Sequence, residues 1–353
     1  MKLKMIFHFI LILIFVINII FFGEVHGRPL AQRPLLAHMT QKGQIYDCVD
    51  YYKQPAFDHP LLKNHIPKVR PNLTTSFQGK FVGFQGSCPD GTVPILRQFE
   101  DPPPKTIPAK AHCHAVVRTN KKKKFYGTSA LPSLNKPKVQ VNQWSAARLK
   151  LSNGPDSIEA GWMVYPTFFK DDEAHLYAKY KAGSTECLNT YCPGFVQEAK
   201  DLPLGTVPDT YSIISGEQHM WNISINKHQD DGNWWLSMTW PDSGTRQIGY
   251  WPKSLFTMLE DSATQVEWGG EIDDPGAVEP APSMGSGLKA EYHQEESAFF
   301  QQITVVDESF NNVQPDGTEK YYDCPDLYTV LDWGDAGDDH GRLISYGGFY
   351  PLP

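Results

Sequence analysis

Short runs rich in Val, Ile, Thr, Tyr and Trp recur from Val139 onward, and this pattern limits the possible fold more than any other feature of the sequence. Turns rich in Gly, Pro, Asn and Asp separate the runs. The clearest runs are residues 175–180, 220–226, 234–240, 247–251 and 303–306. This spacing favours an antiparallel β-sandwich over strands that alternate with helices. One short helix is expected at residues 253–260, because Pro252 stands at its start.

Two of the expected strands carry a glutamate beside glycine. In residues 157–165, β-strand alternation places four apolar side chains on one face and Glu159, with Gly161, on the other. Because glycine has no side chain, it leaves room beside the carboxylate for a ligand backbone. Residues 266–272 repeat the arrangement around Glu271. A single strand glutamate is usually solvated or ion-paired, but neither of these has a cation beside it on its own strand, so the two could meet across one groove.

Residues 1–27 have the form of a secretory signal peptide. Lys2 and Lys4 precede an apolar run over residues 5–22, and the small residues Gly23 and Gly27 follow it. Because no basic stop-transfer cluster comes after the run, a cleaved signal is favoured over a stable membrane anchor. The mature protein is therefore expected to be secreted, either extracellular or within the secretory pathway.

Six cysteines fit an oxidising compartment. Cys187 and Cys192 are close in sequence and precede a Pro-Gly turn, so they suggest a small disulfide loop. Cys48 and Cys88 both lie in the N-terminal half and could bridge each other. The remaining two, at positions 113 and 324, stay unassigned.

No metal or other cofactor is expected, because no Cys-x-x-Cys pair and no His-rich helix accompanies the cysteines. Asn72 and Asn222 each begin an Asn-x-Ser/Thr sequence and are expected glycosylation sites in a secreted chain.

The net charge of −8 hides a division between the two parts of the chain. Residues 28–130 contain 16 Lys and Arg against 6 Asp and Glu, whereas residues 131–353 contain 14 against 33. The two parts should attract each other at neutral pH, and protonation of carboxylates should weaken the attraction. Because the C-terminal part is strongly acidic and would repel phosphate groups, nucleic acid is not expected as a partner.

A linker is expected at residues 100–135. Residues 101–104 read Asp-Pro-Pro-Pro, which is stiff and extended, and residues 121–124 are four consecutive lysines, which will be solvated. The expected organisation is a signal peptide at 1–27, a small N-terminal domain at 28–130 that includes a processing site in this linker, and a β-sandwich at 131–353.

Several motifs occur in an order that resembles a known family. The N-terminal ones are residues 47–50, 54–60 and 88–95, and the C-terminal ones are residues 158–162, 187–197, 232–235, 248–252 and 268–271. Over nearly its whole length the chain resembles the plant neprosin family of secreted glutamic peptidases. The resemblance implies a β-sandwich with a concave cleft, an inhibitory propeptide, proline-containing substrates cut after proline, and activity at acid pH. It also implies that Glu159 and Glu271 are the catalytic pair.

Such a pair has a physical rationale of its own. Hydrolysis without a metal needs one group to activate water and another to donate a proton. Two carboxylates within a few ångströms cannot both ionise easily, so they would share one proton and titrate as a unit. Gln143 is a candidate to stabilise the oxyanion, and Tyr250 and Trp268 are candidates to contact a proline ring.

Two other functions fit the same residues. A secreted sandwich rich in Trp and Tyr can be a carbohydrate-binding module, in which Glu159 would accept hydrogen bonds from hydroxyl groups. Paired carboxylates also cleave glycosidic bonds, at separations of about 5–9.5 Å. Digestion of a proline-containing peptide by the acidified protein separates the peptidase from both.

Overall fold

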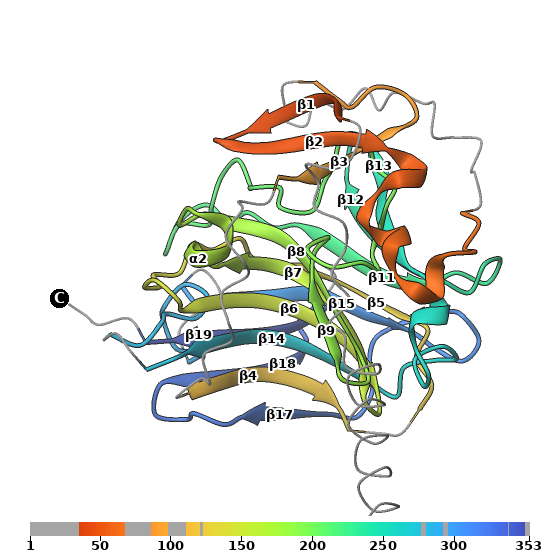
Figure 1. Cartoon of the computed structure of the whole chain (residues 1–353). Helices are drawn as coiled ribbons and strands as arrows, with labels where there is room; N and C mark the ends of the chain where they lie inside the picture. The colour runs from red at the N-terminus through yellow and green to blue at the C-terminus, as the bar shows by residue number, and fades with distance from the viewer. Residues whose placement is uncertain are drawn as a thin grey trace, which may run out of the picture.

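Two large antiparallel β-sheets form the body of the protein, and a small third sheet lies against them (Figure 1). The computed structural model describes residues 35–67, 86–97, 111–120, 123–276, 280–291, 296–337 and 339–349. The expected fold, an antiparallel β-sandwich preceded by a small N-terminal domain, is confirmed.

The seven-stranded sheet carries both glutamates. Its strands, in spatial order, are β17 (Thr318–Tyr322), β4 (Ala111–Thr119), β14 (Gln265–Asp274), β6 (Trp144–Asn153), β7 (Asp156–Val164), β8 (Ala174–Ala182) and β9 (Thr185–Leu188).

A nine-stranded sheet packs behind it. Its order is β10 (Val196–Gln197), β13 (Gly244–Trp251), β12 (Trp234–Trp240), β11 (Asn222–Lys227), β5 (Gly127–Pro132), β15 (Ala298–Val306), β19 (Arg342–Gly348) and β18 (Tyr328–Asp335), with β16 (Asn312–Val313) paired to β15. The third sheet contains β1 (Leu35–Gln41), β2 (Gln44–Asp50) and β3 (Thr92–Leu96).

The helices among the described residues are short. They are α2 (Pro166–Phe169) and the 3₁₀ turns η2 (Tyr51–Lys53), η3 (Pro55–Asp58), η4 (Pro60–Leu62) and η6 (Lys253–Leu255). The helix expected at 253–260 therefore ends after one turn. The reason is Asp156, whose Oδ2 accepts the backbone N–H groups of Thr257 (2.8 Å) and Met258 (2.7 Å). Those amides point at a carboxylate and do not continue a helix.

The core between the two sheets follows the alternation predicted for residues 157–165. The four apolar residues on the predicted inner face of β7 are all buried there: Ile158, Ala160, Trp162 and Val164. The indole N–H of Trp162 donates to the backbone oxygen of Ser133 (2.8 Å), so its one polar group is satisfied inside the core.

The prediction of a linker over residues 100–135 is wrong in part, because two strands lie within this range. Strand β4 (Ala111–Thr119) pairs with β14 and β17, and β5 (Gly127–Pro132) pairs with β11 and β15. The sandwich thus includes described residues from 111 onward, ahead of the predicted start at 131. The lysine run belongs to the connection between these strands, where Lys123 and Lys124 are exposed and pair with Asp316 and Asp261. Residues 98–110 and 121–122 lie outside the described residues.

Three disulfides join the six cysteines. Cys48–Cys88 and Cys187–Cys192 form as predicted. The two unassigned cysteines form the third bond, Cys113–Cys324, which ties β4 to the segment before β18.

The predicted signal peptide lies outside the described residues, as does Asn72. Asn222 begins strand β11 and is partly exposed, and its glycosylation stays a prediction. Within the part of the chain that the structure describes, no helix has the length and apolar character needed to span a bilayer.

Candidate active site

Glu159 and Glu271 lie on the same face of the seven-stranded sheet. Glu159 is on β7 and Glu271 on β14, with β6 between these two strands. In the pairing register Glu159 lies opposite Lys150 of β6, and Glu271 lies opposite Ala146 of the same strand. Both β6 positions are even-numbered and so point to one face, away from the core. Both glutamates are buried, at 2% and 3% relative exposure.

Arg148 lies on β6 between the two glutamate strands and carries the central charge of the site. Its Nε contacts Oε2 of Glu271, and its Nη1 is 2.9 Å from Oε2 of Glu267. Its register neighbours are Gly161 on β7 and Gly269 on β14. A Cβ on Gly161 would lie 1.9 Å from the backbone oxygen of the residue before Arg148. The space expected for a ligand backbone is therefore taken by strand β6 itself.

Glu159 is surrounded by donors from the strands on either side. Tyr177 of β8 donates its hydroxyl hydrogen to Oε1 (3.2 Å), and Lys179 Nζ is 3.2 Å from the same oxygen. Lys150 Nζ lies 3.8 Å from Oε2. Burial would lower the pKa of Lys179, but the charges of Glu159 and Glu271 raise it above its usual range, so Lys179 stays cationic.

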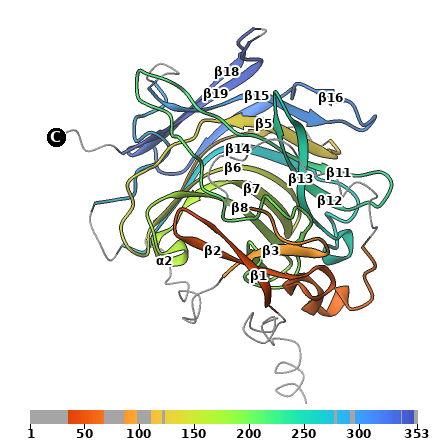
Figure 2. The same cartoon turned by 90° about the horizontal axis from the view of Figure 1, so that it is seen from above.

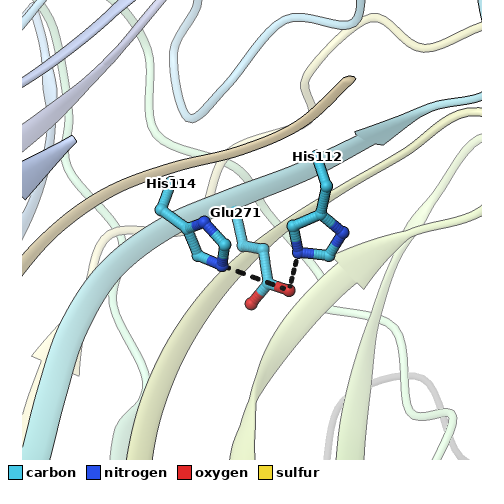
Figure 3. A group of neighbouring side chains, drawn as sticks. All are labelled: His112, His114 and Glu271. Carbon is cyan, nitrogen blue, oxygen red and sulfur yellow. Dashed lines mark hydrogen bonds and ion pairs between the residues drawn. The ribbon is translucent and has the colours of Figure 1, made fainter. Parts of the chain in front are cut away.

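Glu271 also contacts two histidines of strand β4 (Figure 3). His112 Nε2 is 2.7 Å from Oε1 of Glu271, and His114 Nε2 is 3.9 Å from the same oxygen. Hydrogen bonds to Asp273 and then Glu271 raise the pKa of His112 to about 9. His112 is therefore an imidazolium at neutral pH.

A proton shared between Glu159 and Glu271 stays a prediction. Burial alone would raise the pKa of Glu271, but the charges of Arg148 and Lys179 and the hydrogen bond from His112 hold it well below the ordinary 4.5. Glu271 is thus ionised in this form. The contacts described for both carboxylates are with cations, histidines and a hydroxyl.

The other predicted site residues lie elsewhere. Gln143 accepts from Gln140 N (2.8 Å) and donates to Pro280 O (3.0 Å), so its amide holds the loop beyond β14. Trp268 is fully buried in the core, because it is one residue out of phase with Glu267 and Glu271, and its indole donates to a threonine there. Trp268 is therefore not a cleft residue. A role for Gln143 in catalysis stays a prediction and requires these bonds to be exchanged.

Tyr250 is covered by the N-terminal unit, the name used here for residues 35–67 and 86–97. Its hydroxyl lies 2.8 Å from Nε2 of His65, and its ring packs on Trp235 with centroids 4.5 Å apart. Tyr250 is on β13 of the nine-stranded sheet, whereas the glutamates are on the other sheet. It contacts His65 of the N-terminal unit in this form.

The N-terminal unit packs on the glutamate-bearing face of the seven-stranded sheet. Figures 1 and 2 both place β1–β3 alongside β8. Met39 and Tyr46 of the unit share one apolar cluster with Ala146, Met163 and Tyr177 of the sheet. Tyr177 is also the residue that donates to Glu159, so one side chain links this apolar cluster to the carboxylate.

Amide and hydroxyl groups fasten the unit to the sandwich. The side-chain amide of Gln54 accepts from the backbone N–H of Gln197 (2.7 Å) and donates to the backbone oxygen of the same residue (3.1 Å). It thus satisfies both backbone groups of Gln197, as a neighbouring strand does. Gln41 bonds Val207 in the same way (3.0 Å each). Tyr51 donates to Glu198 at the same interface.

The charge attraction expected between the two parts is present at Lys42, whose positive charge favours the ionised carboxylates of Glu173 and Asp209, but other pairs differ from the expected pattern. An ion pair across the interface joins Asp90 to Lys200 (2.6 Å), and here the N-terminal partner is the acid. Arg118, Lys123 and Lys124, which contributed to the basic balance of residues 28–130, belong to the sandwich.

Sequence reasoning missed Arg148, Lys179, Tyr177 and both histidines. The histidines fell in the expected linker. A signal for them was present, since a His-x-His sequence on a strand places both rings on one face.

Comparison with known proteins identifies the family. The chain matches the neprosin domain over residues 141–349 and the neprosin activation peptide over residues 38–128, a stretch that includes β4 of the sandwich. Among solved structures it is similar to scytalido-glutamic peptidase with a peptide-based transition-state analogue, at 10% identity and a TM-score of 0.40, covering 69% of this chain and 100% of that chain. SCP-B, a member of the eqolisin family of peptidases in a complex with the tripeptide Ala-Ile-His, gives 9% identity, a TM-score of 0.38 and the same coverages. The chain belongs to the neprosin family and carries that family's activation peptide.

Proposed function

We propose that the protein is a secreted glutamic peptidase made as a zymogen, with Glu159 and Glu271 as its catalytic pair. The observation that carries this proposal is the placement of two buried glutamates on one face of one sheet, beneath the activation peptide of a neprosin-family chain. Isolated buried carboxylates are costly, so a pair kept at such a position is a candidate for chemistry.

The contacts of the two carboxylates suggest their roles. Arg148 favours the ionised form of Glu271, which is therefore assigned as the base that takes a proton from water. Glu159 is assigned as the acid that protonates the leaving nitrogen. Activity at acid pH is part of this proposal, because acidification supplies the proton that this step consumes. Arg148 and Lys179 would also stabilise negative charge on the carbonyl oxygen.

Cleavage after proline is the specificity proposed, and Trp144 is the aromatic residue best placed to hold the proline ring. Its ring lies 5.7 Å from that of His112 and 5.8 Å from Nζ of Lys179, so it borders both carboxylate sites. It is only partly buried. Flat aromatic faces suit the proline ring, and Trp144 takes the place of Trp268 in this role.

Latency in this proposal follows from the position of the N-terminal unit. Met39 and Tyr46 of the unit share an apolar cluster with Tyr177, which donates to Glu159, and in this proposal the docked unit keeps substrate from Glu159. Activation then needs cleavage between the unit and β4, that is within residues 98–110, followed by release of the unit.

Peptide mapping tests the proposal. The full-length protein is acidified, its own shortening is followed, and a proline-containing peptide is then digested and its fragments are identified by mass. Glu159→Gln and Glu271→Gln are the matched variants, because each keeps the size of the side chain and removes its charge. We expect cuts after proline that disappear in both variants. Equal fragments from either variant would refute the assignment.

The cations on both carboxylates favour a second candidate function, a binding module without hydrolysis. Arg148 and Lys179 neutralise the charges that catalysis would use. Intact peptide after removal of the N-terminal unit, together with retention on immobilised glycan, would support this reading over the peptidase.

A further inference from the structure

Strand β4 presents two histidines toward one carboxylate. His112 and His114 are two residues apart and so share a face, while Cys113 between them points into the core. In the register between β4 and β14, His114 lies opposite Glu271. Both rings therefore face the Glu271 carboxylate (Figure 3).

The three donor atoms are close enough to hold one ion. The donor atoms of His112, His114 and Glu271 all lie within 4.8 Å of one another. The two Nε2 atoms are 2.7 Å and 3.9 Å from Oε1 of Glu271. Ligand atoms about 2.0–2.2 Å from a tetrahedral Zn²⁺ are roughly 3.3–3.6 Å apart, so each histidine–carboxylate distance has to change by less than about 1 Å.

The Nδ1 atom of each histidine, on the ring side away from Glu271, lies near a further carboxylate. His112 Nδ1 is 3.2 Å from Oδ1 of Asp273, and His114 Nδ1 is 2.8 Å from Oδ2 of Asp323. The other oxygen of Asp323 accepts the backbone N–H of His114 (2.6 Å), which fixes the carboxylate in place. A carboxylate that accepts the Nδ1 proton leaves Nε2 as the donor atom for a metal, and metal-binding histidines are usually held in this way.

Access and charge also fit an ion. The His112 side chain is 40% exposed and that of His114 22%, so the site opens to solvent on the histidine side. Arg148 contacts Oε2 of Glu271, which leaves Oε1 to face the histidines. Asp273 and Asp323 add negative charge around the position.

We propose that His112, His114 and Glu271 form a binding site for a first-row divalent transition-metal ion such as Zn²⁺. Two imidazole nitrogens and one carboxylate oxygen are ligands that Zn²⁺ and its neighbours prefer over Ca²⁺ or Mg²⁺. The ion takes the place of the proton on His112 Nε2, and that proton passes to the solvent. A fourth position stays open to water.

Calorimetric titration of the full-length, chelator-treated chain with ZnCl₂ near neutral pH tests the site. We expect one ion per chain. Asp323→Asn should weaken binding about 10–100-fold, because it removes only a supporting carboxylate, and His112→Gln or His114→Gln should weaken it further. The matched control is His340→Gln, which changes an exposed histidine bound to Gln301 (3.0 Å) and should leave the affinity unchanged.

Spectroscopy and thermal denaturation complete the test. Co²⁺ added in place of Zn²⁺ should give visible absorption of a low-symmetry site in the native chain and not in His112→Gln. Thermal unfolding confirms that each variant is folded. The site is refuted if the native chain binds no stoichiometric Zn²⁺, or if His340→Gln loses as much affinity as His114→Gln.

One consequence rests on the proposed function. If Glu271 is the catalytic base, bound Zn²⁺ occupies the oxygen that would accept the proton, so the processed enzyme should lose activity with the same midpoint as Zn²⁺ binding. Full activity at saturating Zn²⁺ would refute this shared use of Glu271. A chain that binds Zn²⁺ but cuts no peptide refutes the peptidase alone, and one that cuts peptide without binding Zn²⁺ refutes the metal site alone.

Discussion

Arg148→Gln removes the buried cation that pairs with Glu271 and Glu267. The Arg148 side chain is 1% exposed and that of Glu271 4%, so water cannot replace the lost charge. Leaving a buried charge without its partner costs about 3–5 kcal/mol. Because His112 and Lys179 still face Glu271, we expect the free energy of unfolding at neutral pH to fall by about 3 kcal/mol, the low end of that range.

The pH dependence of this loss follows from the pKa of Glu271. In the native chain that pKa is well below 4.5, so the stabilisation is present above the unfolded value and is lost as pH falls through the folded one. Without Arg148, burial still raises this pKa while Lys179 and His112 alone are left to lower it, so the folded pKa of Glu271 moves upward, toward the unfolded value. The difference between native chain and variant should therefore shrink on acidification.

Urea unfolding at about pH 7 and about pH 4, with a chelator present, measures both effects. The matched control is Arg246→Gln, which breaks a partly exposed pair with Asp201 (2.7 Å) in the other sheet and should cost about 1 kcal/mol at neutral pH. An Arg148→Gln chain that loses less than the control at neutral pH, or as much in acid as at neutral pH, would refute the reasoning.

Three further predictions concern packing, a buried acid and the interface. Gly161→Ala should lower the free energy of unfolding by about 3 kcal/mol, because its Cβ would lie 1.9 Å from a backbone oxygen of β6; unchanged urea unfolding would contradict this. Burial would raise the pKa of Asp156, but backbone N–H groups of the 257–259 turn hold it below 3.8, so its stabilisation is present at neutral pH and lost as pH falls through the folded pKa. Asp156→Asn should therefore cost about 1.5–3 kcal/mol near neutral pH and little in strong acid, measured by thermal unfolding across pH. Tyr51→Phe loses the hydrogen bond to Glu198, so limited proteolysis should release the N-terminal unit roughly tenfold faster, whereas Tyr52→Phe, at a side chain 59% exposed, should behave as the native chain.

The strand pattern and the glutamate strands were predictable because both depend on short-range alternation. A run such as residues 157–165 shows its two faces in sequence, so the burial of Trp162 and the outward position of Glu159 follow from position alone. The same rule places Trp268 in the core, since it is one residue out of phase with Glu267. The prediction of Trp268 as a cleft residue relied on its aromatic side chain and overlooked its position in the strand alternation.

The charges of the site could not be predicted because they depend on which strands are neighbours. Arg148 meets Glu271 only because β6 pairs with β14, and the two residues are far apart in sequence. Lys179 reaches Glu159 because β8 pairs with β7. The prediction of two carboxylates without nearby cations considered each strand by itself. Strand β4 was missed for another reason, since the prolines before it and the lysines after it suggested a linker.

The disulfide between Cys113 and Cys324 determines what each possible cut would leave behind. The bond spans 211 residues and holds β4 to the far end of the sandwich. A cut within residues 98–110 severs the N-terminal unit from every strand of the sandwich. A cut at the lysine run would leave β4 attached through sulfur, as a light chain that separates from the heavy chain on a gel only after reduction. Electrophoresis with and without a thiol therefore locates the maturation cut.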